Sequence, residues 1–258
     1  MIKDLTIIFT VRIDSEARFE NVKATLSYYR ELTQGAPTVL LEADSKPKLR
    51  EIMRTEFPEV DYIFIQDVNP IFHRTHYINE EFRRVKTQNA AVIDSDVIVP
   101  KNQLIRANKL LLFSDEIMVF PYDGRFIGCD AYMSNIFRQR LNPKIFEAID
   151  GNQQLMFGFI SVGGAYLVNV NRYKTVGWEN ENFPGWGPED FEREHRLDIL
   201  GHKPKRIMGK IFHLNHPRGI NSSNSYSPLV LKTKREYCRV CAMSAPDLME
   251  YIASWPWV

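Results

Sequence analysis

Apolar residues in the first half of the chain follow two periods in turn. Short runs of aliphatic and β-branched residues are typical of buried strands, and between them apolar residues recur every three or four positions, as on one face of a helix. An order of this kind predicts an α/β fold with a mostly parallel central sheet and flanking helices. We expect strands at Leu5–Val11, Thr38–Leu41, Tyr62–Ile65, Ala90–Ile93 and Ile117–Tyr122, and helices at Glu16–Leu32, Lys46–Phe57, Asn79–Asn89 and Lys101–Phe113.

Polar residues gather at the carboxyl ends of four of these strands. In open parallel sheets, ligands bind at that edge, where the loops from neighbouring strands meet. The sequence therefore predicts a ligand site built from Thr10–Asp14, Glu42–Asp44, Gln66–Asp67 and Asp94–Asp96.

The pattern changes after about residue 151, where glycine and aromatic residues become dense. We expect a smaller mixed-strand subregion that continues the first sheet and contains a strand at Arg206–Phe212. The polar run Asn221–Ser227 predicts a loop, and Ala245–Ser254 predicts a short helix. We therefore expect a single domain over 1–258, with parts at about 1–125, 126–220 and 221–258.

Composition and charge narrow the classes of function. The 258 residues carry 33 basic and 32 acidic side chains, a net charge of +1, which gives no reason to expect a nucleic-acid partner. No apolar stretch approaches the roughly 20 residues that span a bilayer. We expect a cytoplasmic protein without a transmembrane segment. Contact with a membrane surface stays open, because a lipid-linked substrate does not require the enzyme to span the bilayer.

The three cysteines predict no disulfide framework. Cys238 and Cys241 form one CxxC pair. A structural zinc site needs four ligands, and the sequence offers no second CxxC, so two unligated thiols are the favoured interpretation.

The first chemical motif is the pair Asp94 and Asp96. It follows a buried strand, and alternation along an extended chain would place both carboxylates on one side. Two carboxylates on one side of the chain suit a divalent cation that also binds a diphosphate. The alternatives are a solvated acidic pair, or a haloacid dehalogenase-type phosphatase, in which such a motif follows the first strand rather than about the fourth.

The second motif is the segment Phe183–Glu192. Glycines on both sides of Trp186 would let its indole lie over a sugar, and Pro188 suits the start of a helix. Glu189 and Asp190 would then fall in the first helical turn, where the helix dipole favours negative charge without any further function.

The third element is a pair of histidines that closes the expected strand Arg206–Phe212. His213 ends the strand and His216 follows three residues later. Neutral imidazole is a common ligand of transition metals and would bias a carboxylate site from Mg²⁺ towards Mn²⁺. Taken alone, the pair fits a structural role better than a metal site.

In order, these motifs resemble the β-1,4-galactosyltransferase family and related inverting GT-A glycosyltransferases. The resemblance spans about residues 7–218 and is most specific at its tryptophan-containing segment. It implies a GT-A fold, a UDP-sugar donor, a glycan or lipid-linked acceptor, and Mn²⁺ (or Mg²⁺) as cofactor. The matching positions are Phe9–Arg12, Asp94–Asp96, Gly163-Gly164, Gly185–Asp190 and His213–His216.

The resemblance also implies a role for each motif. Asp96 would be the principal metal carboxylate, His213 the second ligand and His216 a candidate third. Asp190 would be the catalytic base of a direct, inverting displacement at the anomeric carbon. The remaining residues would bind the donor: Thr10, Arg12 and Asp14 the uridine and diphosphate, Asp94 the ribose or the metal, Gly163 and Gly164 the donor and acceptor by close backbone approach, Trp186 the sugar ring, and Glu189 a sugar hydroxyl.

The sequence departs from the family pattern at two positions. Phe191 stands where the family has a polar residue after the acidic pair, and Ser161 stands where vertebrate members carry a bulky aromatic residue. A small Ser161 leaves room for an N-acetyl group, so GalNAc is as good a candidate as Gal. The alternatives are a non-catalytic nucleotide- or glycan-binding module and a nucleotidyltransferase, although the first loop lacks the glycine-rich signature of the latter.

Overall fold

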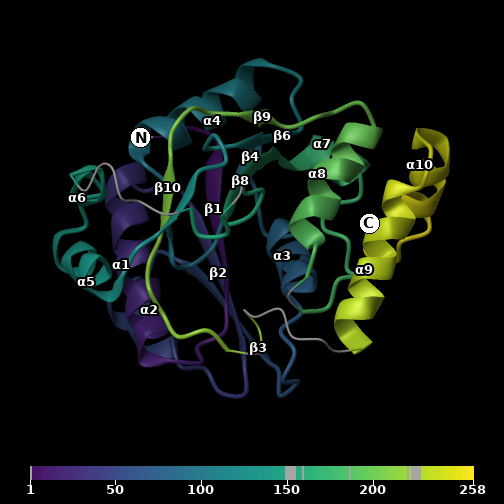
Figure 1. Ribbon diagram of the computed structural model, residues 1–258. Coiled ribbons are helices and arrows are strands. Elements are labelled where there is room, and N and C mark those ends of the chain that lie inside the picture. The colour runs from purple at the N-terminus through teal and green to yellow at the C-terminus, as the bar shows by residue number, and fades with distance from the viewer. Residues whose placement is uncertain (1, 149–154, 159, 186, 220, 222–227) are drawn as a thin grey trace.

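A seven-stranded sheet forms the centre of the molecule in the computed structural model, which describes residues 2–148, 155–158, 160–185, 187–219, 221 and 228–258 (Figure 1). Its strand order is β3-β2-β1-β4-β8-β6-β9. Strands β3, β2, β1 and β4 pair in parallel, and β8 runs antiparallel to both β4 and β6. The bounds are β1 Leu5–Val11, β2 Thr38–Asp44, β3 Asp61–Gln66, β4 Asn89–Ile93, β6 Met118–Phe120, β8 Ala165–Asn169 and β9 Lys205–Arg206.

A second, three-stranded sheet joins the two halves of the chain. Its order is β5-β10-β7, with β5 at Val97–Ile98, β7 at Phe126–Gly128 and β10 at Ile211–His213. In the antiparallel β10–β5 ladder, His213 lies opposite Val97. This register brings the end of β10 to the turn that follows β4, which is where the candidate site lies.

Helices cover the central sheet and extend along one side of it (Figure 1). The long helix α1 begins where Ser15 accepts a hydrogen bond from the backbone N–H of Arg18. At the C-terminal side, α9 packs on α8. The bounds are α1 Glu16–Thr33, α2 Arg50–Thr55, α3 Arg74–Phe82, α4 Lys101–Phe113, α5 Ala131–Arg140, α6 Lys144–Glu147, α7 Val170–Thr175, α8 Glu189–Ile199, α9 Pro228–Cys241 and α10 Ala245–Ala253. None of the helices in the described part of the chain is long and apolar enough to cross a lipid bilayer.

The α/β class and the mostly parallel sheet are confirmed, and the helix Lys101–Phe113 has the predicted bounds. The helix predicted at Asn79–Asn89 is displaced: α3 begins at Arg74 and ends at Phe82, and Asn89 already opens β4. The Asn89 side chain donates to the Asn108 side-chain oxygen of α4 at 2.8 Å. This contact with α4 holds Asn89 in the strand, although the sequence periodicity continues the helical pattern to it.

Two further predictions are corrected by local chemistry. The helix expected at Lys46–Phe57 begins only at Arg50, because Glu42 at the end of β2 accepts hydrogen bonds from the backbone of Lys48 and Leu49. The strand expected at Arg206–Phe212 is broken by a turn. Gly209 in that turn has φ +134°, a conformation open to glycine. Helix α9 was not predicted, and all of the expected loop except Asn221 lies outside the described residues.

Candidate active site

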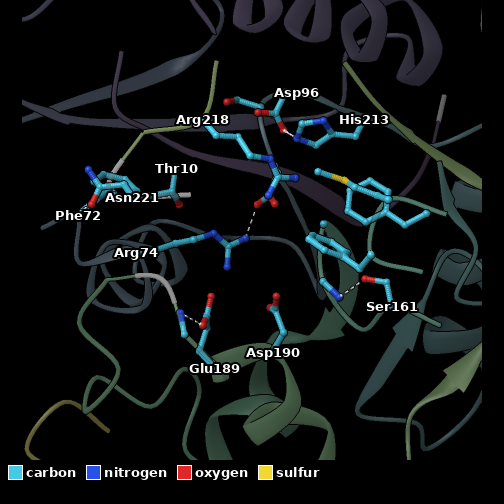
Figure 2. A pocket seen from close by; sticks show the side chains of 18 of the residues that line it. Thr10, Phe72, Arg74, Asp96, Ser161, Glu189, Asp190, His213, Arg218 and Asn221 are labelled. Carbon is cyan, nitrogen blue, oxygen red and sulfur yellow. Dashed lines mark hydrogen bonds and ion pairs between the residues drawn. The ribbon is translucent and has the colours of Figure 1, made fainter. Parts of the chain in front are cut away.

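A cleft of about 550 Å³ opens at the carboxyl ends of β1 and β4. Figure 2 shows Asp96 and His213 on one wall, Glu189 and Asp190 on the opposite wall, and Arg74 reaching between them. The structure brings together every site residue that we predicted within its described part. These are Thr10, Arg12, Asp14, Asp94, Asp96, Gly163, Gly164, Glu189, Asp190, His213 and His216. Trp186 lies outside the described residues.

The Asp96 carboxylate faces two imidazoles. Its Oδ2 lies 3.1 Å from Nε2 of His216, and its Oδ1 lies 3.5 Å from Nε2 of His213. One ligand-capable atom from each residue lies within 4.8 Å of those of the other two. The backbone N–H of Leu214 donates to the Asp96 carbonyl at 2.8 Å, so β10 fixes the histidines beside the aspartate.

This donor set fits a divalent transition metal. One carboxylate and two imidazoles are ligands that Mn²⁺ accepts, and imidazole binds metal only in its neutral form. Burial lowers the pKa of His213 to about 4, so the ring is neutral at pH 7. Burial alone would raise the pKa of Asp96, but His213, His216 and Arg18 hold it well below its usual range. Asp96, His213 and His216 are therefore the residues that would hold the ion.

Arg18 of α1 is a cationic neighbour of this group that sequence reasoning missed. Its Nη1 is 3.1 Å from Oδ2 of Asp96, and its Nε is 3.0 Å from Oδ1 of Asp14. Asp14 precedes α1 and lies four residues before Arg18, a spacing that could have suggested the pair. We predicted that Asp14 contacts the sugar donor. In the structure it pairs with Arg18, the arginine that neutralises Asp96.

Asp94 lies in the same cleft but has a different partner. The chain turns after β4, with the Val97 N–H bonded to the Asp94 carbonyl at 2.9 Å, so the extended alternation expected from the DxD spacing does not hold. Asp94 pairs with Arg74, Nη2 to Oδ1 at 2.5 Å. Burial raises the pKa of Asp94, and Arg74 opposes that effect. Asp94 is not in the carboxylate–histidine group.

Arg74, the first residue of α3, is the central cation of the cleft (Figure 2). Burial acts to lower its pKa, but Asp94 and Asp190 outweigh burial and raise it. The positive charge of Arg74 therefore stabilises carboxylates on both walls of the cleft. The sequence prediction missed it because the predicted helix began at Asn79, which left Arg74 in a loop.

Asp190 lies on the wall opposite the histidines, in the first turn of α8. Its Oδ2 lies against the backbone of Gly163: a Cβ atom at that position would be 2.4 Å from Oδ2. Only glycine allows this approach without displacing the carboxylate. The Gly163 carbonyl accepts a hydrogen bond from the Tyr122 hydroxyl at 2.6 Å, which fixes the strand entry beside Asp190.

Glu189 precedes Asp190 and is 7% exposed. Its Oε2 accepts a hydrogen bond from the Gly187 N–H at 3.0 Å. Burial, followed by the charge of Asp190, raises the pKa of Glu189 to about 8. Glu189 is therefore mostly protonated at neutral pH and can donate a hydrogen bond to a ligand oxygen.

The raised pKa of Glu189 predicts a pH-dependent stability. A raised pKa means that the folded state holds the proton more tightly than the unfolded state. That contribution is complete below about pH 4.5 and is lost as pH rises through about 8. We expect Glu189→Gln to become progressively more stable relative to wild type from about pH 5 to 8, by up to about 1.4 kcal/mol per pH unit, and the difference to level off above about pH 8. Urea unfolding at several pH values measures the difference.

Glu250→Gln, on an exposed glutamate of α10, is the control for this measurement. Its stability should follow the wild-type curve at every pH. Parallel curves for Glu189→Gln and wild type would contradict the raised pKa.

Two predicted donor contacts have internal partners in the structure. Arg12 forms an ion pair with Asp67 and donates from Nε to the Ala43 carbonyl at 2.8 Å. The Thr10 hydroxyl donates to the buried carboxylate of Glu81. Both residues line the cleft, but Arg12 ties the end of β1 to the ends of β2 and β3, and Thr10 ties β1 to α3.

The remaining lining residues include apolar and cationic side chains that the sequence did not single out. Arg218 lies over the Phe157 ring, with Cζ 5.6 Å from the ring centroid. Asn221 accepts from the Phe72 N–H at 2.9 Å and so closes one end of the cleft (Figure 2). Further lining comes from Phe126, Met156, Val162, Val230 and Lys234, and from Phe191, which the sequence had marked as a departure from the family pattern.

Solved structures with a similar arrangement of strands and helices include glycosyltransferases. S. aureus TarS in complex with UDP-GlcNAc matches with a TM-score of 0.64 at 11% identity, over 95% of this chain and 69% of that one. GalNAc-T7 with UDP, GalNAc and Mn²⁺ matches with a TM-score of 0.58 at 13% identity, over 98% of this chain and 52% of that one. This chain has the GT-A fold.

A third GT-A structure matches with a TM-score of 0.53 at 15% identity, over 90% of this chain and 79% of that one. It is a Drosophila β-1,4-galactosyltransferase 7 mutant in complex with manganese, UDP-Gal and xylobiose. No family model matches the sequence, and no curated protein does. The likeness is therefore one of fold.

Proposed function

We propose that this protein is a metal-dependent, inverting glycosyltransferase that moves a hexose or N-acetylhexosamine from a UDP-sugar to a hydroxyl acceptor. One observation carries the proposal. A carboxylate–imidazole group and a carboxylate with a cleft-facing oxygen stand on opposite walls of one cleft, in a GT-A fold. The first group suits a diphosphate-bound cation, and the second suits a base.

Asp190 is the proposed base. Its Oδ1 is held by Arg193 at 2.8 Å, whereas its Oδ2 lies against Gly163, and the carboxylate points into the cleft (Figure 2). The lone pairs of Oδ2 can accept the proton of an acceptor hydroxyl as its oxygen attacks the anomeric carbon. One base on the face opposite the leaving group is enough for a single displacement, and the anomeric configuration then inverts.

Asp96, His213 and His216 are the proposed metal ligands. A Mn²⁺ (or Mg²⁺) ion bound there would stabilise the negative charge of the departing nucleotide diphosphate. Arg18 pairs with Asp96 and Arg74 pairs with Asp94, so both add fixed positive charge to the cleft. Asp94, held by Arg74, is left to contact the ribose or the sugar.

Ser161 supports a donor with an N-acetyl group. Its side chain is 4% exposed and lines the cleft, and its Oγ accepts the Gly163 N–H at 3.2 Å. The hydroxyl is thus turned to the backbone, and no bulk projects from this position. We therefore favour GalNAc or Gal as the sugar, with a glycan or a lipid-linked alcohol as acceptor.

A ligand panel tests the proposal. A ligand that binds only the folded state raises the melting temperature. We expect one UDP-sugar to raise it in the presence of Mn²⁺ but not with EDTA, and UDP-GalNAc and UDP-Gal to rank above UDP-Glc. CDP-, GDP- and ADP-sugars serve as controls. The proposal fails if no UDP-sugar shifts the melting temperature at saturating concentration with Mn²⁺.

A further inference from the structure

A buried ion pair between Arg193 and Glu179 lies next to Asp190. Arg193 is one helical turn after Asp190 on α8, and its side chain is 0% exposed. Its guanidinium donates two hydrogen bonds to the Glu179 carboxylate, Nη2 to Oε2 at 2.7 Å and Nε to Oε1 at 3.0 Å. The Arg193 Cζ lies 4.2 Å from the ring centroid of Tyr166 on β8, an interior strand, so this pair lies between α8 and a face of the central sheet.

Two tyrosines complete the hydrogen bonding of Glu179. The hydroxyls of Tyr166 on β8 and Tyr173 on α7 donate to its Oε1 at 2.6 and 2.8 Å. Burial acts to raise the pKa of Glu179, but Arg193 and these hydroxyls lower it to about 2. Glu179 is therefore a fixed anion with every partner in place, and it anchors Arg193 in one orientation.

The third nitrogen of the Arg193 guanidinium binds a residue of the cleft wall. Nη1 donates to Oδ1 of Asp190 at 2.8 Å, while Oδ2 of the same carboxylate lies against the backbone of Gly163. One oxygen is thus bound by Arg193, and the other lies against Gly163, which lines the cleft together with Asp190. A planar guanidinium can satisfy two carboxylates at fixed angles in this way, and a lysine ammonium cannot.

We propose that Arg193 is a positioning residue that holds the Asp190 carboxylate in its proton-accepting orientation, with Glu179, Tyr166 and Tyr173 as its anchor. The inference rests on the proposed function, because it takes Asp190 as the base. A purely structural ion pair would be complete with Glu179 alone. The contact with a carboxylate on the cleft wall is the part that a structural role does not require.

Helix α8 supplies a matched control one turn further on. Arg196 is also 0% exposed and pairs with Glu192, Nε to Oε1 at 2.9 Å. It donates to the Val176 and Trp178 carbonyls rather than to a cleft residue. Removing both charges of either pair avoids leaving one charge buried and unpaired. The two double variants to compare are therefore Glu179→Gln/Arg193→Met and Glu192→Gln/Arg196→Met.

Steady-state kinetics with the wild-type donor and acceptor test the proposal. We expect Glu179→Gln/Arg193→Met to lower kcat by about 10²-fold, as for a misplaced catalytic group, and to leave the donor KM within about threefold. Glu192→Gln/Arg196→Met should keep kcat within about threefold even if its melting temperature falls. Arg193→Lys, which keeps the charge but not the fork, should lose kcat too. Equal kcat losses in the two double variants, or a wild-type kcat in Arg193→Lys, would overturn the inference.

Crystal structures of the same variants separate this inference from the proposed function. If the wild-type protein transfers no sugar, the proposed function fails, but the orientation of Asp190 is still measurable. We expect the Asp190 carboxylate to leave Gly163 in Glu179→Gln/Arg193→Met and in Arg193→Lys, and to stay in Glu192→Gln/Arg196→Met. An unmoved Asp190 in the Arg193 variants overturns the inference whatever the activity.

Discussion

Replacing Asp190 with asparagine is expected to lower sugar transfer by about 10²–10⁴-fold, the range that a positioned general base contributes. Asparagine has nearly the same shape, and its amide oxygen can still accept the Arg193 N–H that reaches Oδ1 of Asp190 at 2.8 Å. The amide nitrogen beside Gly163 cannot accept a proton. The variant should therefore lose the chemical step and keep its fold.

A measurement of donor binding distinguishes loss of the chemical step from a general loss of structure. Affinity for the UDP-sugar with Mn²⁺, measured by calorimetry, should stay within about threefold of wild type in Asp190→Asn, because no part of the carboxylate–histidine group changes. Asp198→Asn, on an exposed aspartate of the same helix, is the control and should transfer sugar at the wild-type rate. Normal turnover by Asp190→Asn would remove Asp190 from the role of base.

Replacing Asp96 with asparagine is expected to weaken Mn²⁺ binding by at least about 10²-fold, because even residues behind the ligands of a metal typically contribute 10–100-fold. Asp96 is the one anion of its three-residue group, and it lies 3.1 Å from His216 and 3.5 Å from His213. Without it, two imidazoles would have to hold the cation next to Arg18 with no anionic ligand. Metal-dependent donor binding should disappear as well.

Asp94→Asn tests whether the two aspartates of the motif have different roles. Asp94 pairs with Arg74 rather than with the histidines, so Mn²⁺ affinity in this variant should stay within about threefold of wild type. Direct titration of each variant with Mn²⁺, followed by electron paramagnetic resonance, gives the affinities without any activity assay. Equal Mn²⁺ affinities of Asp96→Asn and wild type would exclude the proposed metal site.

The parts of the fold that could be predicted from the sequence depend on local patterns. The helix Lys101–Phe113 and the strand Leu5–Val11 have strong periodicity and clear ends, and both predictions are confirmed. The cleft was predictable in outline because parallel strands bring their carboxyl ends to one edge. The roles of the individual residues in that cleft stay predictions until the variants are measured.

The parts that escaped prediction depend on pairing between distant segments. His213 reaches Asp96 because β10 pairs with β5 in one register, and nothing within either segment specifies that register. Arg74 was missed because the packing of α3 starts the helix five residues earlier than periodicity suggested. Arg193 was missed because its partner Glu179 is 14 residues away and follows α7.

The most direct test of the account is mass spectrometry of the protein incubated with UDP-GalNAc or UDP-Gal, Mn²⁺ and a panel of glycan and lipid-linked acceptors. We predict release of UDP together with an acceptor that has gained one sugar, both abolished by EDTA and by Asp190→Asn. Metal-dependent binding of a UDP-sugar with neither product on any acceptor would contradict catalysis and identify the protein as a binding module.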